Sequence, residues 1–294
     1  MTDNTISKLS HTPSRWQKLL SSVWHERGTF VGSVIVIFFF VIGILGLLQL
    51  TPYPIFEQHP LDRLSAPDST YWLGTDQFGR DVLSRIMKGT ANSLQVAVLT
   101  VTISTVIGTA IGTVAGYFGG RVDNIIMRTM DVIFAFPALL LALLIVTILG
   151  QGLYNTVLAI SIVYTPIFAR VSRGQVISVK EMEFVLAARS LGGGHGLIIM
   201  RHILPNILPV MIVQVTLALS WALITEAGLS FLGLGTQQPE PSLGLELSSN
   251  RGLAEIAPWL ILYPGLAIML MVLGFNLLGD GLRDLLDPRT RGRS

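Results

Sequence analysis

Long uncharged stretches alternate with shorter charged ones along most of the chain. The stretches without Asp, Glu, Lys or Arg cover residues 28–56, 89–120, 132–169, 202–225 and 256–279. A helix needs about 20 predominantly apolar residues to cross the hydrocarbon core of a bilayer. The third stretch is too long for one helix, and a turn signal, Gly-Gln-Gly-Leu-Tyr-Asn at 150–155, divides it. The pattern therefore predicts an all-α membrane protein with six transmembrane helices.

Composition agrees with this prediction. Hydrophobic residues make up 51% of the 294 residues and charged residues 13%, whereas a soluble domain carries about 25% charged residues. The chain has no cysteine, which excludes disulfides, thiolate catalysis and Cys-ligated metals. The net charge is only +2 and the basic residues form no cluster, so no nucleic-acid partner is expected. Membrane lipid is the expected surrounding.

Lys and Arg residues are distributed unevenly between the two sides of the membrane. Short cytoplasmic loops of membrane proteins are enriched in these residues. With six spans, 15 of the 20 Lys and Arg residues fall on the side of both termini, and five fall opposite: Arg63, Arg80, Arg85, Lys88 and Arg251. We therefore expect both termini and the loop 170–205 to be cytosolic. The first apolar stretch is expected to stay uncleaved, because a long polar segment precedes it and no small-residue cleavage site follows.

These expectations divide the chain into five parts. They are a cytosolic N-terminal segment (1–28), a first transmembrane helix (29–50), an extracytoplasmic loop (51–92), a core domain with five transmembrane helices (93–288) and a cytosolic tail (289–294). The N-terminal segment is either a docking arm or an interfacial helix. Within the extracytoplasmic loop, apolar residues share one helical face near Asp81 and Arg85, which are spaced i,i+4. The loop is therefore predicted to contain a helix lying on the outer membrane surface.

Glycines recur every four residues in the second span, at Gly108, Gly112 and Gly116. Small residues at this spacing allow another helix backbone to approach closely, so they predict helix packing, and lining of a pore is compatible with it. In the third span, Asp131 follows Arg128 by three residues on the same face. Buried carboxylates in membranes are often functional, and an interfacial ion pair between these two residues explains the pattern equally well.

Prolines inside three spans and one carboxylate mark a possible gate. Pro137, Pro166 and Pro264 each remove a backbone hydrogen bond, so a kink is expected at each. Glu226 lies near the outer end of the fifth span, where it is either an interfacial carboxylate or a polar element of an outer gate. The short glycine-rich segment 230–235 after it is expected to form a re-entrant or kinked extension of that span.

The sequence lacks the motifs of several kinds of site. No glycine precedes a lysine, so no phosphate loop is present, and no HExxH or GxSxG pattern occurs. The extracytoplasmic His and Asp residues match no metal-binding spacing. We therefore expect no catalytic or metal site, and if ATP drives transport its site lies on another polypeptide. An ion-coupled transporter is disfavoured by the lack of an internal repeat, and an intramembrane enzyme by the lack of a paired nucleophile and base.

The loop 170–205 contains a short amphipathic helix at 183–191. Its apolar face is formed by Phe184, Val185, Ala187, Ala188 and Leu191, its polar face carries Arg189, and a triple glycine from Gly192 ends it. A helix of this length is marginal alone in water and needs a packing partner. That partner is either its own membrane bundle or a groove on a soluble protein.

The spacing of this loop resembles that of a known family. Ala187-Ala188, Gly192 and His202-Ile203-Leu204-Pro205 resemble the EAA loop of binding-protein-dependent ABC importer permeases. Leu186 stands where the general pattern has Glu, and both this residue and His202 resemble the peptide and nickel branch. Four further segments resemble motifs of the same branch: LGTDQFGRDVLSR (73–85), GYFGGRVDNIIMR (116–128), TEAGLSFLGLG (225–235) and FNLLGDGLRDLLDP (275–288). One departure is Leu243-Gly244, where the family usually has Trp-Gly, in a loop expected outside.

The resemblance implies the second, C-type permease subunit of a bacterial inner-membrane importer with the type I ABC importer permease fold. It implies a heterodimer with a homologous permease, two cytosolic ATPases that hold ATP and Mg, and an extracytoplasmic substrate-binding protein. This chain itself is expected to bind no cofactor. Helix 183–191 would be the coupling helix, with Glu183, Phe184, Ala187, Ala188, Arg189, Leu191 and Gly192 facing an ATPase. The implied cargo is a dipeptide or oligopeptide, with chelated nickel, glutathione or another small solute as alternatives.

Overall fold

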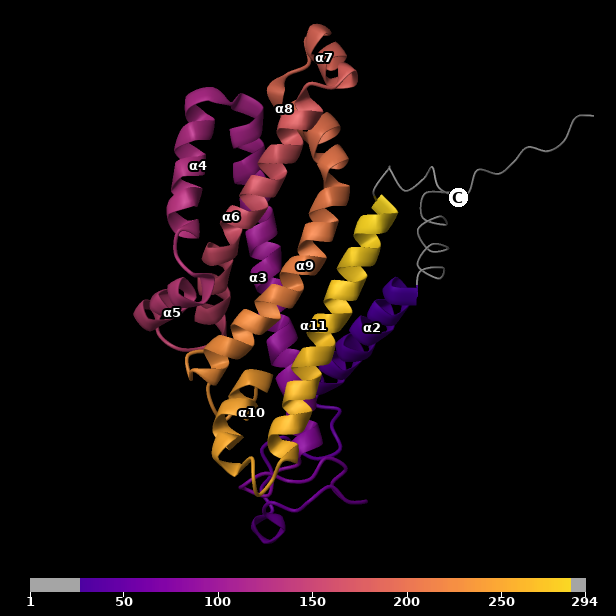
Figure 1. Ribbon diagram of the computed structural model, residues 1–294, viewed down its shortest axis with the longest axis vertical. Coiled ribbons are helices and arrows are strands. Elements are labelled where there is room, and N and C mark those ends of the chain that lie inside the picture. Colours follow the sequence, from indigo (N-terminus) through magenta and orange to yellow (C-terminus); the bar gives the residue numbers. More distant parts are fainter. Residues whose placement is uncertain (1–26, 287–294) are drawn as a thin grey trace, which may run out of the picture.

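The computed structural model describes residues 27–286, which form a bundle of long helices with short helices at its two ends (Figure 1). The predictions for the N-terminal segment before residue 27 and for the tail 289–294 lie outside the described residues. Within residues 27–286 there is no strand beyond an isolated bridge between Thr75 and Asp81. The long helices are α2 (Arg27–Leu47), α3 (Val82–Phe118), α4 (Gly120–Phe134), α5 (Ala138–Leu149), α6 (Leu153–Lys180), α9 (Leu204–Phe231) and α11 (Trp259–Leu286).

The short elements gather at opposite ends of the bundle. At one end lie α7 (Glu183–Ser190) and α8 (His195–Ile198), and we call this the α7 end (Figure 1). A π-helical turn, η2 (Ile199–Ile203), joins α8 to α9, so that His195–Phe231 runs as one helix. The opposite end, the α10 end, holds η1 (Pro60–Asp62), α10 (Leu243–Asn250) and η3 (Arg251–Leu253).

Five of the described helices are long and apolar enough to cross a membrane. The sixth predicted span is broken, because α4 and α5 meet at an angle of 88°. Pro137 stands immediately before α5, and its ring cannot continue the helix that ends at Phe134. The prediction of a kink at this residue therefore understated the change of direction. Pro166 and Pro264 lie inside the uninterrupted helices α6 and α11.

The extracytoplasmic helix predicted on the membrane surface is not a separate element. Residues 82–92 form the first turns of α3, which continues unbroken for 37 residues to Phe118. Asp81 caps this helix, because its carboxylate accepts the backbone N–H of Ser84 at 2.8 Å. Arg85 and Lys88 do not interrupt the helix, since both pair with carboxylates of the segment after α9. The predicted boundary at residue 92 thus falls inside a helix.

The glycines at 108, 112 and 116 lie where α3 meets α6. A Cβ atom on Gly108 would lie 2.6 Å from the carbonyl oxygen of Thr165, and one on Gly116 would lie 2.9 Å from that of Arg173. A Cβ on Gly112 would overlap the carbonyl oxygen of Ala169. The two backbones therefore approach more closely than any other residue type would allow. We call this contact the glycine seam.

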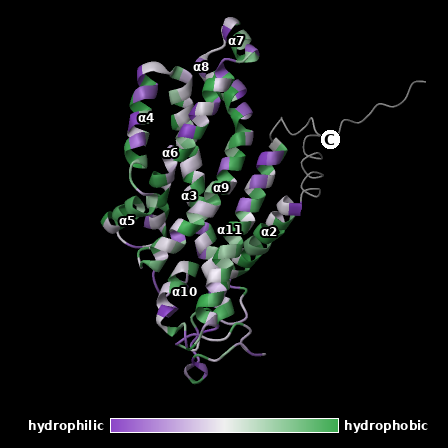
Figure 2. Ribbon diagram, in the orientation of Figure 1, coloured by the Kyte–Doolittle hydropathy of each residue, from purple (hydrophilic) through white to green (hydrophobic). Residues whose placement is uncertain are grey.

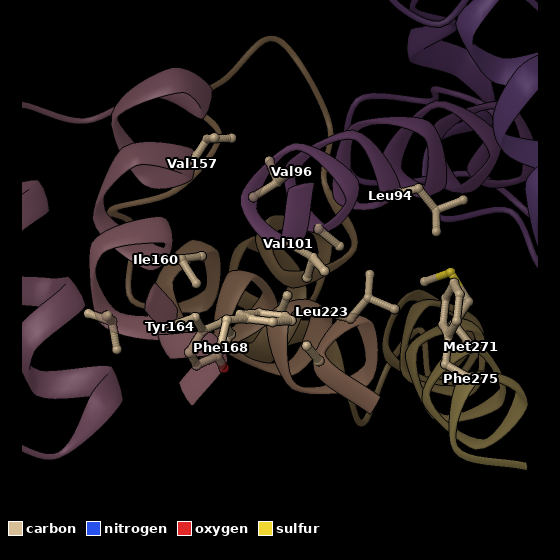
Figure 3. Close-up of a cluster of buried hydrophobic side chains, with 14 of the residues drawn as sticks. Leu94, Val96, Val101, Val157, Ile160, Tyr164, Phe168, Leu223, Met271 and Phe275 are labelled. Atoms are coloured by element: carbon tan, nitrogen blue, oxygen red, sulfur yellow. The ribbon is translucent and has the colours of Figure 1, made fainter. Parts of the chain in front are cut away.

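Buried apolar side chains fill the centre of the bundle on both sides of the seam. Ile160 and Phe168 of α6 pack toward Val96 and Val101 of α3, and Leu223 of α9 joins them (Figure 3). The outer helix α2 packs on α11 and α3, again through glycines, and its remaining surface is apolar (Figure 2). Exposed Ile37 and Phe38 on that surface have the character of a lipid-facing helix.

The glycine seam gives a stability prediction. Gly112→Ala should lower the free energy of unfolding by about 1–3 kcal/mol, because the new methyl group overlaps the α6 backbone. The measurement is thermal unfolding of the purified chain in detergent. Gly174→Ala is the matched control, since Gly174 lies on the exposed face of α6 with open space around it. A loss at Gly174 as large as that at Gly112 would contradict the close approach.

Candidate functional site

Helix α7 stands at the tip of the α7 end, beyond the ends of the long helices (Figure 1). It covers Glu183–Ser190, so the sequence-based range was one residue too long, and Leu191 is its C-cap. Gly192 follows with φ +81°, a conformation that favours glycine. The N–H of Gly193 donates to the carbonyl oxygen of Ala188 at 3.0 Å. The triple glycine thus ends the helix, as the sequence predicted.

The predicted apolar face of α7 is divided in the structure. Val185 points inward and is fully buried, and Ala188 is partly buried. Phe184 and Ala187 are exposed, and Leu191 has 89% of its surface exposed. The described part of the chain therefore covers only a narrow strip of α7. Residues 27–286 therefore leave most of its apolar side chains exposed, apart from a ring contact between Phe184 and His202, as expected for a helix that docks into a groove.

Cationic side chains tie the α7 end together beneath α7. Arg173 of α6 makes two hydrogen bonds of 2.5 Å to the carboxylate of Asp123 in α4. Lys180 at the end of α6 donates to the carbonyl oxygen of Gly116 at 2.8 Å. Asp131 pairs with Arg170 of α6 at 2.7 Å, so the predicted pair with Arg128 is wrong. The packing of α4 against α6 decides the partner, because it directs the Asp131 carboxylate toward α6.

Glu226, the candidate gate residue, lies inside the bundle near the α10 end. It is 1% exposed, and its Oε1 accepts a hydrogen bond from the hydroxyl of Ser230 at 2.7 Å. The hydroxyls of Ser93 in α3 and Ser242, which precedes α10, face the same carboxyl group. Glu226 is therefore enclosed by the protein and is not exposed at its surface. Its carboxyl group lies where three segments that are far apart in the sequence meet.

A second buried polar cluster, which the sequence did not indicate, lies beside Glu226. Arg85 of α3 is 1% exposed and donates to Glu246 of α10 at 2.6 Å. Asp76 lies 3.8 Å from Arg85 and pairs at 2.6 Å with Arg80. The only sequence signal was the charged motif 73–85, whose partner in α10 is 161 residues away. Because buried ions must be paired, this cluster holds α10 against α3.

The segment around α10 is packed into the protein. Ser242 caps α10 by accepting the N–H of Leu245 at 3.3 Å, and Asn92 donates to the carbonyl oxygen of Pro241 at 2.7 Å. Leu243 is fully buried. The position where this chain has Leu243 instead of the family's usual Trp therefore lies in the core of the subunit. The segment 230–235 turns the chain back at the end of α9, with Gly233 at φ +80°, so that α10 packs against α9.

The loop between α2 and α3 is also folded at the α10 end. Tyr71 donates to Asp62 at 3.1 Å, and burial together with this hydrogen bond raises the pKa of Tyr71 to about 12. The indole N–H of Trp259 in α11 donates to the carbonyl oxygen of Thr75 at 3.2 Å. Among residues 27–286 no three His, Asp or Glu side chains come close enough to hold a metal ion.

Comparisons with known proteins agree on one class. Residues 108–292 match the family model described as a binding-protein-dependent transport system inner membrane component. The chain is 46% identical to the dipeptide transport system permease protein DppC of Alkalihalophilus pseudofirmus, over 95% of this chain and 91% of that protein. It is 43% identical to the glutathione transport system permease protein GsiD of Pectobacterium atrosepticum, over 97% and 94%.

The fold is also similar to that of solved structures. A chain of the inward-facing MetNI methionine ABC transporter superposes with a TM-score of 0.57 at 16% identity, over 68% of this chain and 96% of that chain. An amino acid ABC transporter gives a TM-score of 0.51 at 19% identity, over 67% and 91%. At these identities the likeness shows the fold, which is that of the type I importer permeases.

The buried pair of Arg85 and Glu246 gives a second stability prediction. Glu246→Gln should lower the free energy of unfolding by about 3 kcal/mol, because it leaves the Arg85 guanidinium buried beside Asp76 alone. Denaturation of the purified chain measures this loss. The exposed Glu255→Gln should change stability by less than about 0.5 kcal/mol. Adding Arg85→Gln to Glu246→Gln should recover part of the loss, and further loss in the double variant would contradict the pairing.

Proposed function

The chain belongs to the family of binding-protein-dependent transport system inner membrane components, and from this membership we propose that it forms half of a translocation pathway for small peptides. It is a permease subunit of an ABC importer of the bacterial inner membrane. The observation that carries the coupling part of the proposal is α7, an amphipathic helix at the tip of the molecule whose apolar surface is left largely exposed by the described residues. Among the other short helices, α10 is packed into the core and offers no comparable surface.

The substrate proposal rests on two similar relatives. One is named for dipeptide transport and the other for glutathione transport, and glutathione is itself a small peptide derivative. Both share more than two fifths of their residues with this chain over nearly its whole length. A small peptide is therefore the proposed cargo. Chelated nickel or another small solute remains the alternative within the same architecture.

The proposed assembly contains a homologous second permease, two cytosolic ATPases and an extracytoplasmic binding protein. Each ATPase would hold ATP and Mg, and this chain would bind no cofactor. Helix α7, with Ala188 and Leu191, would occupy a groove of one ATPase in the helix-in-groove mode. The exposed apolar side chains of α7 support this arrangement, because such a surface is costly without a partner.

The proposed mechanism needs no covalent chemistry in this chain. Closure of the ATPase pair on ATP moves α7, and α6 and α9 follow because α7 lies between them in the sequence. The helices then change between two packings that open the pathway to opposite sides. Pro137, Pro166 and Pro264 are the proposed points of flexure, and Glu226, which lies between α9, α3 and the segment before α10, is the proposed polar element of the outer gate.

Uptake by the whole complex tests the proposed cargo. The two permeases, the ATPases and the binding protein are reconstituted in vesicles and supplied with labelled dipeptide. Uptake should require ATP. Competition by unlabelled oligopeptide or glutathione shows whether the complex also accepts these peptides. Uptake that is driven by an ion gradient and is indifferent to ATP would indicate a secondary transporter and overturn the proposal.

The coupling role of α7 gives a separate prediction. Ala188→Glu should lower uptake about tenfold or more, because it places a charge in the apolar contact with the ATPase. Uptake and ATP hydrolysis of the reconstituted complex are measured together. Ala254→Glu is the matched control, since Ala254 is exposed next to η3 at the α10 end of the bundle. Normal uptake by the Ala188 variant would contradict the coupling role.

A further inference from the structure

Helix α7 is held by few contacts of its own. It has eight residues, only Val185 is fully buried, and a triple glycine connects it to α8. Such a short helix is marginally stable alone, and glycines let the chain turn freely. A helix that transmits force must nevertheless keep a defined direction relative to the bundle. Some contact outside α7 must therefore fix its orientation.

One side chain of α3 contacts the loop on both sides of the triple glycine. The hydroxyl of Tyr117 lies 2.9 Å from Nδ1 of His195, the first residue of α8 after the glycines. The guanidinium of Arg189, in the last turn of α7 before the glycines, lies 5.7 Å from the centre of the Tyr117 ring. Tyr117 is only 6% exposed. The ring thus joins two residues that flexible glycines would otherwise separate.

Tyr117 stands on a rigid support. It occupies the last turn of α3, one residue after Gly116 of the glycine seam. Lys180 fastens the carbonyl oxygen of Gly116 to the end of α6 at 2.8 Å. At the far end of the same helix, Arg85 is fixed to α10 by its buried pair with Glu246. The position of Tyr117 is therefore set by the packing of the whole helix.

We propose that Tyr117 is a positioning residue that fixes the direction of α7 relative to α3 by holding His195 and Arg189 on either side of the triple glycine. Movement of α7 then reaches α3 directly, in addition to α6 and α9. The consequence for transport rests on the proposed docking of α7 into an ATPase, whereas the structural role does not. Phe118 also touches His195, with ring centres 5.8 Å apart, but its side chain is largely exposed and makes no hydrogen bond to the loop.

The structural role is tested with spin labels, for which the absence of native cysteine is an advantage. Cysteines at Val106 on α3 and Leu186 on α7, both exposed, carry the labels in the full chain in lipid nanodiscs. Double electron–electron resonance then gives the distribution of distances between the two spin labels. Tyr117→Leu should broaden this distribution, and Tyr117→Phe should broaden it less, because it keeps the ring under Arg189 and removes only the hydroxyl. Tyr154→Phe, an exposed tyrosine at the other end of α6, should leave it unchanged.

The transport role is tested by the uptake obtained per ATP hydrolysed in the reconstituted complex. Tyr117→Phe should lower this ratio about threefold, as expected for one lost hydrogen bond. Tyr117→Leu should lower it about tenfold, because the ring contact is lost as well. Removing the His195 side chain in the Tyr117→Phe background should add little, since the two residues act as a pair. Thermal unfolding of each variant shows whether the fold is kept.

The two readouts separate this inference from the proposed function. An unchanged distance distribution in a folded Tyr117→Leu variant would overturn the positioning role, whatever the transport result. A broadened distribution with an unchanged uptake ratio would support the positioning role and contradict the coupling role of α7. Changes in both measurements support both.

Discussion

The close approach of α3 and α6 at the glycine seam is the contact on which the other features depend. Three glycines let the α3 backbone reach the carbonyl oxygens of Thr165, Ala169 and Arg173. Because the two helices cannot slide past one another without overlap, the positions of their ends are fixed together. The α7 end is then set by the last turns of both helices, and the α10 end by the first turns of α3.

The two ends of the bundle are held by different physical means. At the α10 end, Arg85, Asp76 and Glu246 are almost fully buried, and breaking such pairs is costly. At the α7 end, the pair of Arg173 and Asp123 is only partly buried and the pair of Arg170 and Asp131 is exposed, and pairs in contact with solvent contribute less. Local opening therefore costs less at the α7 end. This difference suits a subunit whose outer end keeps its shape while its inner end responds to a partner.

The sequence predicted what depends on local patterns, and it failed where distant contacts decide. The uncharged stretches predicted six spans, of which five are intact helices, and the spacing of Gly108, Gly112 and Gly116 indicated the helix packing that α6 supplies. The helix 183–191 was recognisable from its own residues and the glycines after it. No local pattern revealed that Arg85 pairs with Glu246 or that Leu243 is buried, because a polar loop sequence gives no sign that a helix will pack over it. The break at Pro137 was underestimated for a similar reason, since α5 finds its packing against α6 and α9.

The right-angled junction at Pro137 has a mechanical consequence. Helix α4 is bound to α6 through Asp123 and Arg173, and α5 leaves it at 88° with Leu139 against Gly228 of α9. In such an elbow, a rigid shift of α4 along its own axis carries α5 in a direction perpendicular to the axis of α5. The same displacement in a straight span would only slide the helix through the membrane. An axial displacement of α4 would therefore move the whole length of α5 past its contact with Gly228 of α9.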